Sequence, residues 1–70
     1  MNKKREGTIV IKKLSGKYPF AVDFWGFQQG SGSPCVDMKE VNEEVEYLIS
    51  KHQKDYDLKI NNELEQQQTL

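Results

Sequence analysis

Apolar and polar residues alternate near the start of the chain in a pattern that predicts a β-hairpin. Residues 8–14 are rich in β-branched side chains, and residues 17–27 carry apolar side chains at every second position from Tyr18 to Phe24. The dipeptide Ser15-Gly16 between the two segments has the chemistry of a tight turn. We therefore expect two antiparallel strands.

The turn determines which residues of the hairpin face each other. If Ser15-Gly16 forms a two-residue loop, Ile11 lies opposite Phe20 and Ile9 lies opposite Val22. One face then carries the apolar side chains Ile9, Ile11, Tyr18, Phe20, Val22 and Phe24. The other face collects Thr8, Val10, Lys12, Pro19, Ala21, Asp23 and Trp25. A register shift of one residue would exchange the two faces.

A helix is predicted after residue 37. Asp37 can cap it, Glu40 completes a capping box, and Val36 and Val41 have the spacing of a hydrophobic staple. Apolar or aromatic residues then recur at steps of three and four up to about residue 56, namely Met38, Val41, Val45, Leu48, Ile49, His52 and Tyr56. This stripe should pack on the apolar face of the hairpin.

The remaining segments complete the predicted fold. Residues 28–34 are rich in glycine, serine and proline, which predicts a flexible loop between sheet and helix. Residues 57–60 alternate again and predict a short third strand. The expected fold is α+β, a small antiparallel sheet with one amphipathic helix packed on one face. We expect a basic flexible arm over residues 1–7, a single domain over 8–60 and a polar C-terminal tail over 61–70.

Length and composition limit the number of domains and the cellular location that we expect for the chain. Seventy residues allow one domain, and Cys35 is the single cysteine, so no disulfide can form within the chain. No apolar stretch approaches the roughly 20 residues that cross a bilayer. We therefore expect a cytoplasmic protein without a membrane segment. Residues 1–20 carry six basic side chains against one carboxylate, whereas residues 21–70 carry four against ten.

The residues with catalytic potential favour structural roles. Cys35 and His52 are the one thiol–imidazole pair, but His52 lies on the apolar stripe and Cys35 fits a small buried position. The carboxylates of residues 40–46 suit a solvated helix face, because acidic side chains stabilise the first turns of a helix. We expect no enzyme activity, no cofactor and no metal.

One functional hypothesis is DNA binding through the arm and the hairpin. Its candidate residues are basic and could contact phosphates, namely Lys3, Lys4, Arg5, Lys12, Lys13 and Lys17. The order of basic arm, hairpin and helix resembles in outline the arm-binding domains of phage integrases, which implies a sheet that lies in a DNA groove. Asp23 on the same sheet face and the acidic helix weigh against this hypothesis.

The preferred hypothesis is protein binding. The predicted register leaves Trp25 on the sheet face that the helix does not cover, with Phe27 beyond it, and large exposed aromatic side chains often anchor interfaces. Tyr47 points away from the apolar stripe, and carboxylates flank it. The predicted protein-binding residues are Trp25, Phe27, Tyr47, Glu43, Glu44 and Glu46. The alternative is that the third strand or the tail covers Trp25 and Phe27.

The sequence thus favours a small non-catalytic module that binds a larger protein and regulates or inhibits it. Its size and its Lys/Glu/Asn-rich composition resemble those of accessory proteins of bacteriophages and mobile elements. If the acidic helix imitates a nucleic acid, its carboxylates should engage a basic groove of the target. An exposed strand edge would also allow a homodimer.

Overall fold

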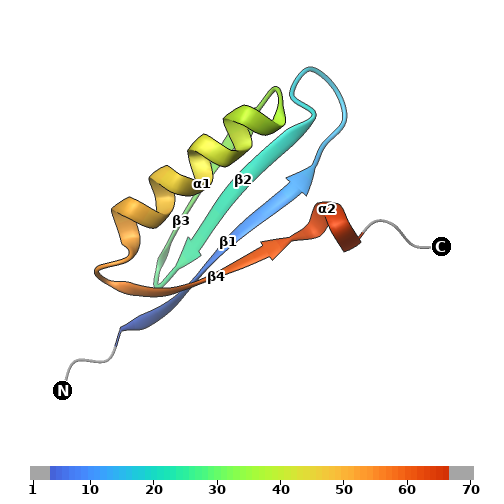
Figure 1. Cartoon of the computed structure of the whole chain (residues 1–70). Helices are drawn as coiled ribbons and strands as arrows, with labels where there is room; N and C mark the ends of the chain where they lie inside the picture. The colour runs from blue at the N-terminus through green and yellow to red at the C-terminus, as the bar shows by residue number, and fades with distance from the viewer. Residues whose placement is uncertain (1–3, 67–70) are drawn as a thin grey trace.

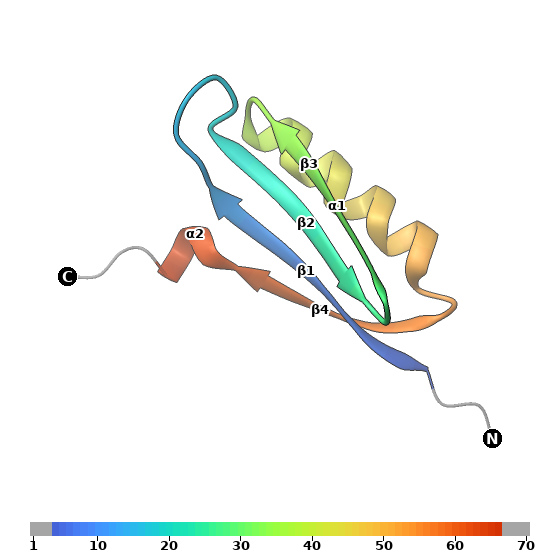
Figure 2. The ribbon, with the colours of Figure 1, turned by 180° about the vertical axis from the view of Figure 1, so that it is seen from behind.

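The chain folds into one sheet with a helix across one face (Figure 1). This computed structural model describes residues 4–66. Its elements are β1 (Arg5–Lys13), β2 (Phe20–Gly26), β3 (Gln29–Cys35), α1 (Met38–His52), β4 (Tyr56–Asn62) and α2 (Glu63–Gln66). The strand order is β3-β2-β1-β4, and the view from behind shows the sheet face that α1 leaves open (Figure 2). The predicted α+β fold with one helix on a small sheet is confirmed.

The sheet is mixed, although an antiparallel sheet was expected. β1, β2 and β3 pair antiparallel in sequence order, whereas β4 pairs parallel with β1. α1 causes this difference, because it carries the chain from one edge of the sheet to the other and lets β4 run in the direction of β1. The predicted third strand over 57–60 is therefore present as β4, with a different direction.

The β1–β2 register differs by two residues from the expected one. Ile11 lies opposite Val22 and not opposite Phe20, because the connection is longer than Ser15-Gly16 alone. The Leu14 N–H donates a hydrogen bond of 2.8 Å to the Pro19 carbonyl at the base of this loop. A shift by an even number leaves every residue within the two strands on its predicted face. Tyr18, expected on the apolar face, instead lies in the loop before β2 and is exposed.

The loop predicted over residues 28–34 is wrong, because most of it forms strand β3. A turn at Phe27-Gln28 joins β2 to β3, and Gln28 adopts a positive φ of 58°. Gly30 of β3 lies opposite Trp25, where an added Cβ would come within 2.9 Å of the indole ring. β3 thus forms by backbone pairing with β2, and Gly30 leaves room for its neighbour across the strand.

The start of α1 follows the predicted capping box. The Asp37 side chain accepts a hydrogen bond from the Glu40 N–H, and the Glu40 carboxylate accepts one from the Val36 N–H, both at 3.0 Å. α1 ends at His52, earlier than expected, because a turn begins there and the Asp55 N–H donates to the His52 carbonyl. Tyr56 consequently belongs to β4.

The hydrophobic core lies between α1 and the sheet. Its buried residues come from all four strands and from α1, namely Ile9, Ile11, Val22, Phe24, Cys35, Val41, Leu48 and Tyr56. The His52 ring stacks on the Phe24 ring with centroids 3.9 Å apart, which makes this histidine a packing residue. Among residues 4–66, no helix is long and apolar enough to cross a membrane.

Both predicted terminal segments are partly structured. β1 begins at Arg5, so residues 5–7 of the expected arm lie in the sheet. Residues 61 and 62 of the expected tail end β4, and Glu63–Gln66 form α2. Lys3 of the predicted nucleic-acid-binding set lies outside the described residues.

Candidate protein-binding surface

Trp25 lies exposed on the open face of the sheet. Its side chain is 57% exposed, and it borders a shallow depression together with Asp23, Gly30, Ser31 and Gly32. The expected third strand does not cover it, because β4 lies beside β1 at the opposite edge of the sheet. Trp25 therefore presents an aromatic surface at the β2–β3 side of the molecule.

An ion pair occupies the centre of the same face. The Lys12 ammonium lies 2.8 Å from the Asp23 carboxylate, and Asp23 is buried. The hydrogen bond from Lys12 and the negative charge of Asp23 raise the pKa of Lys12 above its usual value. Lys12 is thus engaged within the sheet, and its charge is already balanced by Asp23.

A second depression lies between β3 and α1. It is bordered by Ser33, Pro34 and Cys35 from β3 and by Glu40, Glu43, Glu44 and Tyr47 from α1, and we call it the acidic groove. Tyr47 is 54% exposed, and the Lys51 ammonium lies 5.6 Å from its ring centroid. The Ser33 hydroxyl donates a hydrogen bond of 3.0 Å to the Glu44 carboxylate and so connects the two walls.

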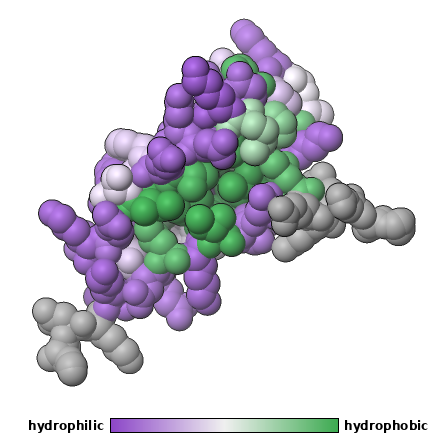
Figure 3. All heavy atoms as spheres, viewed as in Figure 1, coloured by the Kyte–Doolittle hydropathy of each residue, from purple (hydrophilic) through white to green (hydrophobic). Residues whose placement is uncertain are grey.

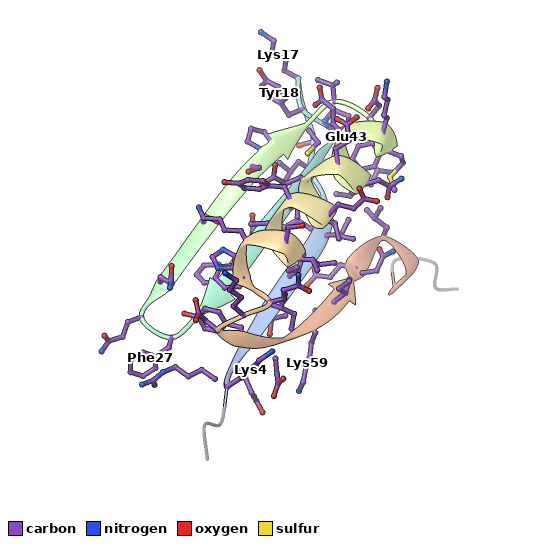
Figure 4. The ribbon with its side chains drawn as sticks, turned by 60° about the vertical axis from the view of Figure 1, so that its left-hand side comes forward. Lys4, Lys17, Tyr18, Phe27, Glu43 and Lys59 are labelled. Atoms are coloured by element: carbon purple, nitrogen blue, oxygen red, sulfur yellow. The ribbon has the colours of Figure 1, made fainter. Side chains whose placement is uncertain are left out.

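The other predicted binding residues lie apart from this groove. Glu46 is exposed on α1 but does not border the groove. Phe27 is 50% exposed in the β2–β3 turn, where the Arg5 guanidinium stacks 3.9 Å from its ring centroid. Figure 4 shows Phe27 at the end of the molecule where Lys4 lies, far from Glu43. The six predicted residues therefore do not form one patch.

The basic residues predicted to bind DNA are divided between two ends. Lys4 and Arg5 lie at the start of β1, whereas Lys13 ends this strand and Lys17 lies in the loop beyond it (Figure 4). The Lys4 ammonium donates a hydrogen bond of 2.7 Å to the Gln53 carbonyl. The length of the sheet thus separates the two groups, with the ion-paired Lys12 between them.

An apolar band that the sequence pattern did not predict lies on the helix side of the sheet. Figure 3 shows this band beside α1, where the helix leaves part of the sheet uncovered. Val45, Ile49, Leu58 and Leu64 are only partly buried against the core, and Ile60 of β4 is 52% exposed. The alternation of residues 56, 58 and 60 already predicts one apolar face for this strand, and the position of β4 at an edge leaves that face partly open.

The structure does not bring Cys35 and His52 together. Cys35 precedes α1 and His52 is the last residue of this helix, so the length of α1 separates them. Burial raises the pKa of the Cys35 thiol, and the charges of Glu40, Glu44 and Asp37 raise it further. The thiol is therefore protonated at neutral pH, which disfavours a role as nucleophile.

Strand β3 lies between the two depressions. Trp25 lies beside it on the open face, and Tyr47 with the acidic groove lies beside it on the helix side.

The chain matches no known protein-family model, no curated protein and no solved structure. Its function is therefore inferred from these surfaces.

Proposed function

We propose that the chain is a small non-catalytic module that binds a larger protein and thereby regulates or inhibits it. One observation carries this proposal: two depressions, each with an exposed aromatic side chain, flank the same edge strand. Tryptophan and tyrosine are enriched among residues that dominate binding energy at protein interfaces. The carboxylates around Tyr47 would supply a polar rim.

The positions of Trp25 and Tyr47 suit one continuous contact. Both side chains lie beside β3, Trp25 on the open face of the sheet and Tyr47 on the helix side. β3 is the edge strand, so no further strand separates the two faces there. A partner that wraps around this edge would contact both rings. A cytoplasmic location fits the single free cysteine, Cys35, which has no disulfide partner in the chain.

DNA binding stays a prediction with weaker support. A duplex would have to contact two basic groups that lie at opposite ends of β1, and Asp23 stands on the face between them. Phosphate contacts by few separated lysines give weak, strongly salt-dependent binding. We therefore keep protein binding as the function that the geometry favours.

The proposal is tested by affinity capture of the partner from extracts of the cells that make the protein. Trp25→Ala and Tyr47→Ala should each weaken capture by about tenfold or more, as expected when an interface anchor worth about 2 kcal/mol is removed. Tyr18→Ala is the matched control, because Tyr18 is also an exposed aromatic residue but borders neither depression.

Equal capture by all three variants would contradict the proposal. If a partner is found, its activity is then measured with and without the purified chain. A regulator or inhibitor changes that activity at concentrations near its dissociation constant, whereas Trp25→Ala should require correspondingly more protein for the same effect.

A further inference from the structure

The free edge of β3 exposes the backbone of every second residue. The Leu14 N–H bonds the Pro19 carbonyl, so odd-numbered residues of β2 bond to β1 and even-numbered ones bond to β3. Even-numbered residues of β2 pair with odd-numbered residues of β3. The backbone groups of Gly30, Gly32 and Pro34 therefore point away from the sheet. Pro34 fits this position, because proline has no N–H to pair.

The two sides of this edge differ in shape and charge. On the open face, Gly30 and Gly32 have no side chains, so nothing from β3 stands between an added strand and Trp25. On the helix side, an added strand would run along the acidic groove beside Glu43 and Tyr47. Side chains of a strand alternate between faces, so one added strand would meet both surfaces.

We propose that the β3 edge binds an extended basic segment of the partner as an additional strand. This inference rests on the proposed function and specifies its binding mode. Backbone groups of Gly30 and Gly32 would provide the main-chain hydrogen bonds, and the flanking surfaces would select alternate side chains. The segment carries lysine or arginine at positions that face α1 and apolar residues at positions that face Trp25.

The charge of the groove argues for a basic occupant. Glu40 and Glu44 already accept hydrogen bonds from Val36 and Ser33. Glu43 is exposed and makes no hydrogen bond or ion pair within residues 4–66, so its carboxylate is open to a cation. A lysine or arginine side chain beside it would also reach the ring of Tyr47, which is a favourable cation–π partner.

The test is a titration of isotope-labelled protein, followed by amide chemical shifts. The probe is an eight-residue peptide of alternating lysine and valine, and its control is the same peptide with glutamate in place of lysine. The amide signals of Gly30 and Gly32 should shift with the lysine peptide, together with those of the acidic groove. Those of Leu58 and Ile60 on the other edge strand should not, and the glutamate peptide should cause no shifts.

Two charge-matched variants check that the groove itself is recognised. Glu43→Gln should lower the affinity for the lysine peptide by about twofold to fivefold, the range of an exposed ion pair. Glu46→Gln removes the same charge from the same helix but outside the groove, so it should leave the affinity unchanged. Equal losses in both variants would show general charge attraction and overturn the inference.

Other outcomes separate this inference from the proposed function. Shifts that spare Gly30 and Gly32, or no binding of the lysine peptide, would overturn strand addition. Concentration-dependent shifts of Gly30 and Gly32 in the chain alone would also overturn it, because the occupant would then be a second copy. In each case partner capture that depends on Trp25 and Tyr47 would leave the proposed function standing.

Discussion

The two edge strands of the sheet differ in how they meet solvent. β4 carries Asp57 and Lys59, and charged side chains on an edge strand discourage pairing with another chain. β3 has the sequence QGSGSPC and carries no charge, so Pro34 is its one unfavourable residue for strand addition. The edge that lies between the aromatic surface and the acidic groove is therefore the edge left open.

The edges also differ in what holds them in place. β4 is anchored by Tyr56, whose buried ring packs edge-on against Phe24 with centroids 5.3 Å apart. β3 contributes Cys35 to the core, but its middle residues are held by backbone pairing with β2. One hydrogen bond of 2.8 Å joins the two strands, from the Gln29 side-chain amide to the Tyr56 hydroxyl. Side-chain changes should therefore cost more on β4 than on β3.

The largest effect is expected at Tyr56. Tyr56→Ala removes a buried ring that packs on Phe24 and His52 and should cost about 3–5 kcal/mol, against a total of about 4–10 kcal/mol for a chain of this length. Tyr56→Phe keeps the ring and loses only the hydrogen bond from Gln29, at about 1 kcal/mol. Urea unfolding followed by circular dichroism measures both values. Equal losses in the two variants would contradict an anchor made by the ring.

The next effect compares two glycines, one that faces the ring of Tyr56 from β4 and one that lies opposite Trp25. A Cβ at Gly26 would come within 2.9 Å of the buried rings of Phe24 and Tyr56, so Gly26→Ala should cost about 1–3 kcal/mol. A Cβ at Gly30 would come equally close to Trp25 and 3.3 Å from the Phe24 carbonyl oxygen, but the indole ring is exposed and can turn aside, so Gly30→Ala should cost less, about 1 kcal/mol or below. Urea unfolding curves of the two variants measure both changes in the free energy of unfolding. A larger loss for Gly30→Ala than for Gly26→Ala would show that Trp25 is rigidly held.

The same contrast explains which elements could be predicted from sequence. In β4 and α1 the apolar side chains that pack on the core recur with the period of a strand or a helix. The sequence therefore predicts Leu58 in the third strand and Val41 and Leu48 in the helix correctly. β3 lacks β-branched and aromatic residues, and its strand exists because β2 offers a backbone to pair with. Glycine at residue 30 indicated flexibility by composition, whereas its actual role is to make room for Trp25.

The candidate site was predictable residue by residue but not as an arrangement. The two-residue alternation of the hairpin predicts that Trp25 is exposed, and the helical spacing of the apolar stripe predicts the same for Tyr47; both are exposed. The sequence could not show that Trp25 and Tyr47 lie on either side of one strand. The composition of residues 28–34 predicts a loop, so it gives β2 no neighbouring strand on that side. Phe27 was placed beyond Trp25 by parity, but the turn at Phe27-Gln28 ends the alternation and directs its ring to Arg5.

Alkaline pH should affect the β3 end of the core by a smaller amount. Burial first, and then nearby carboxylates, raise the pKa of Cys35 in the folded state above its ordinary value of 9.0. The folded chain therefore keeps a proton that the unfolded chain loses, and the stability this contributes is complete below that ordinary value and falls as pH rises through the raised pKa.

Urea unfolding at about pH 7 and about pH 10 measures this loss of stability. Lysine and tyrosine side chains also titrate in this range, so the comparison is with Cys35→Ala, which should lose less stability between the two pH values. An equal loss in both proteins would mean that the thiol of Cys35 ionises as easily in the folded chain as in the unfolded one.

The smallest effect on stability, and the sharpest on binding, should come from giving β3 a charge like those of β4. Ser31 is exposed on β3, so Ser31→Lys should change the free energy of unfolding by less than about 0.5 kcal/mol. The new ammonium would repel a basic strand at this edge, so the variant should lose the amide shifts that the lysine–valine peptide causes at Gly30 and Gly32. Ser31→Thr, which adds bulk without charge, should keep them. If Ser31→Lys binds the peptide as tightly as the unchanged protein, the open edge of β3 is not where the basic segment lies, and the contrast between the two edges would concern stability alone.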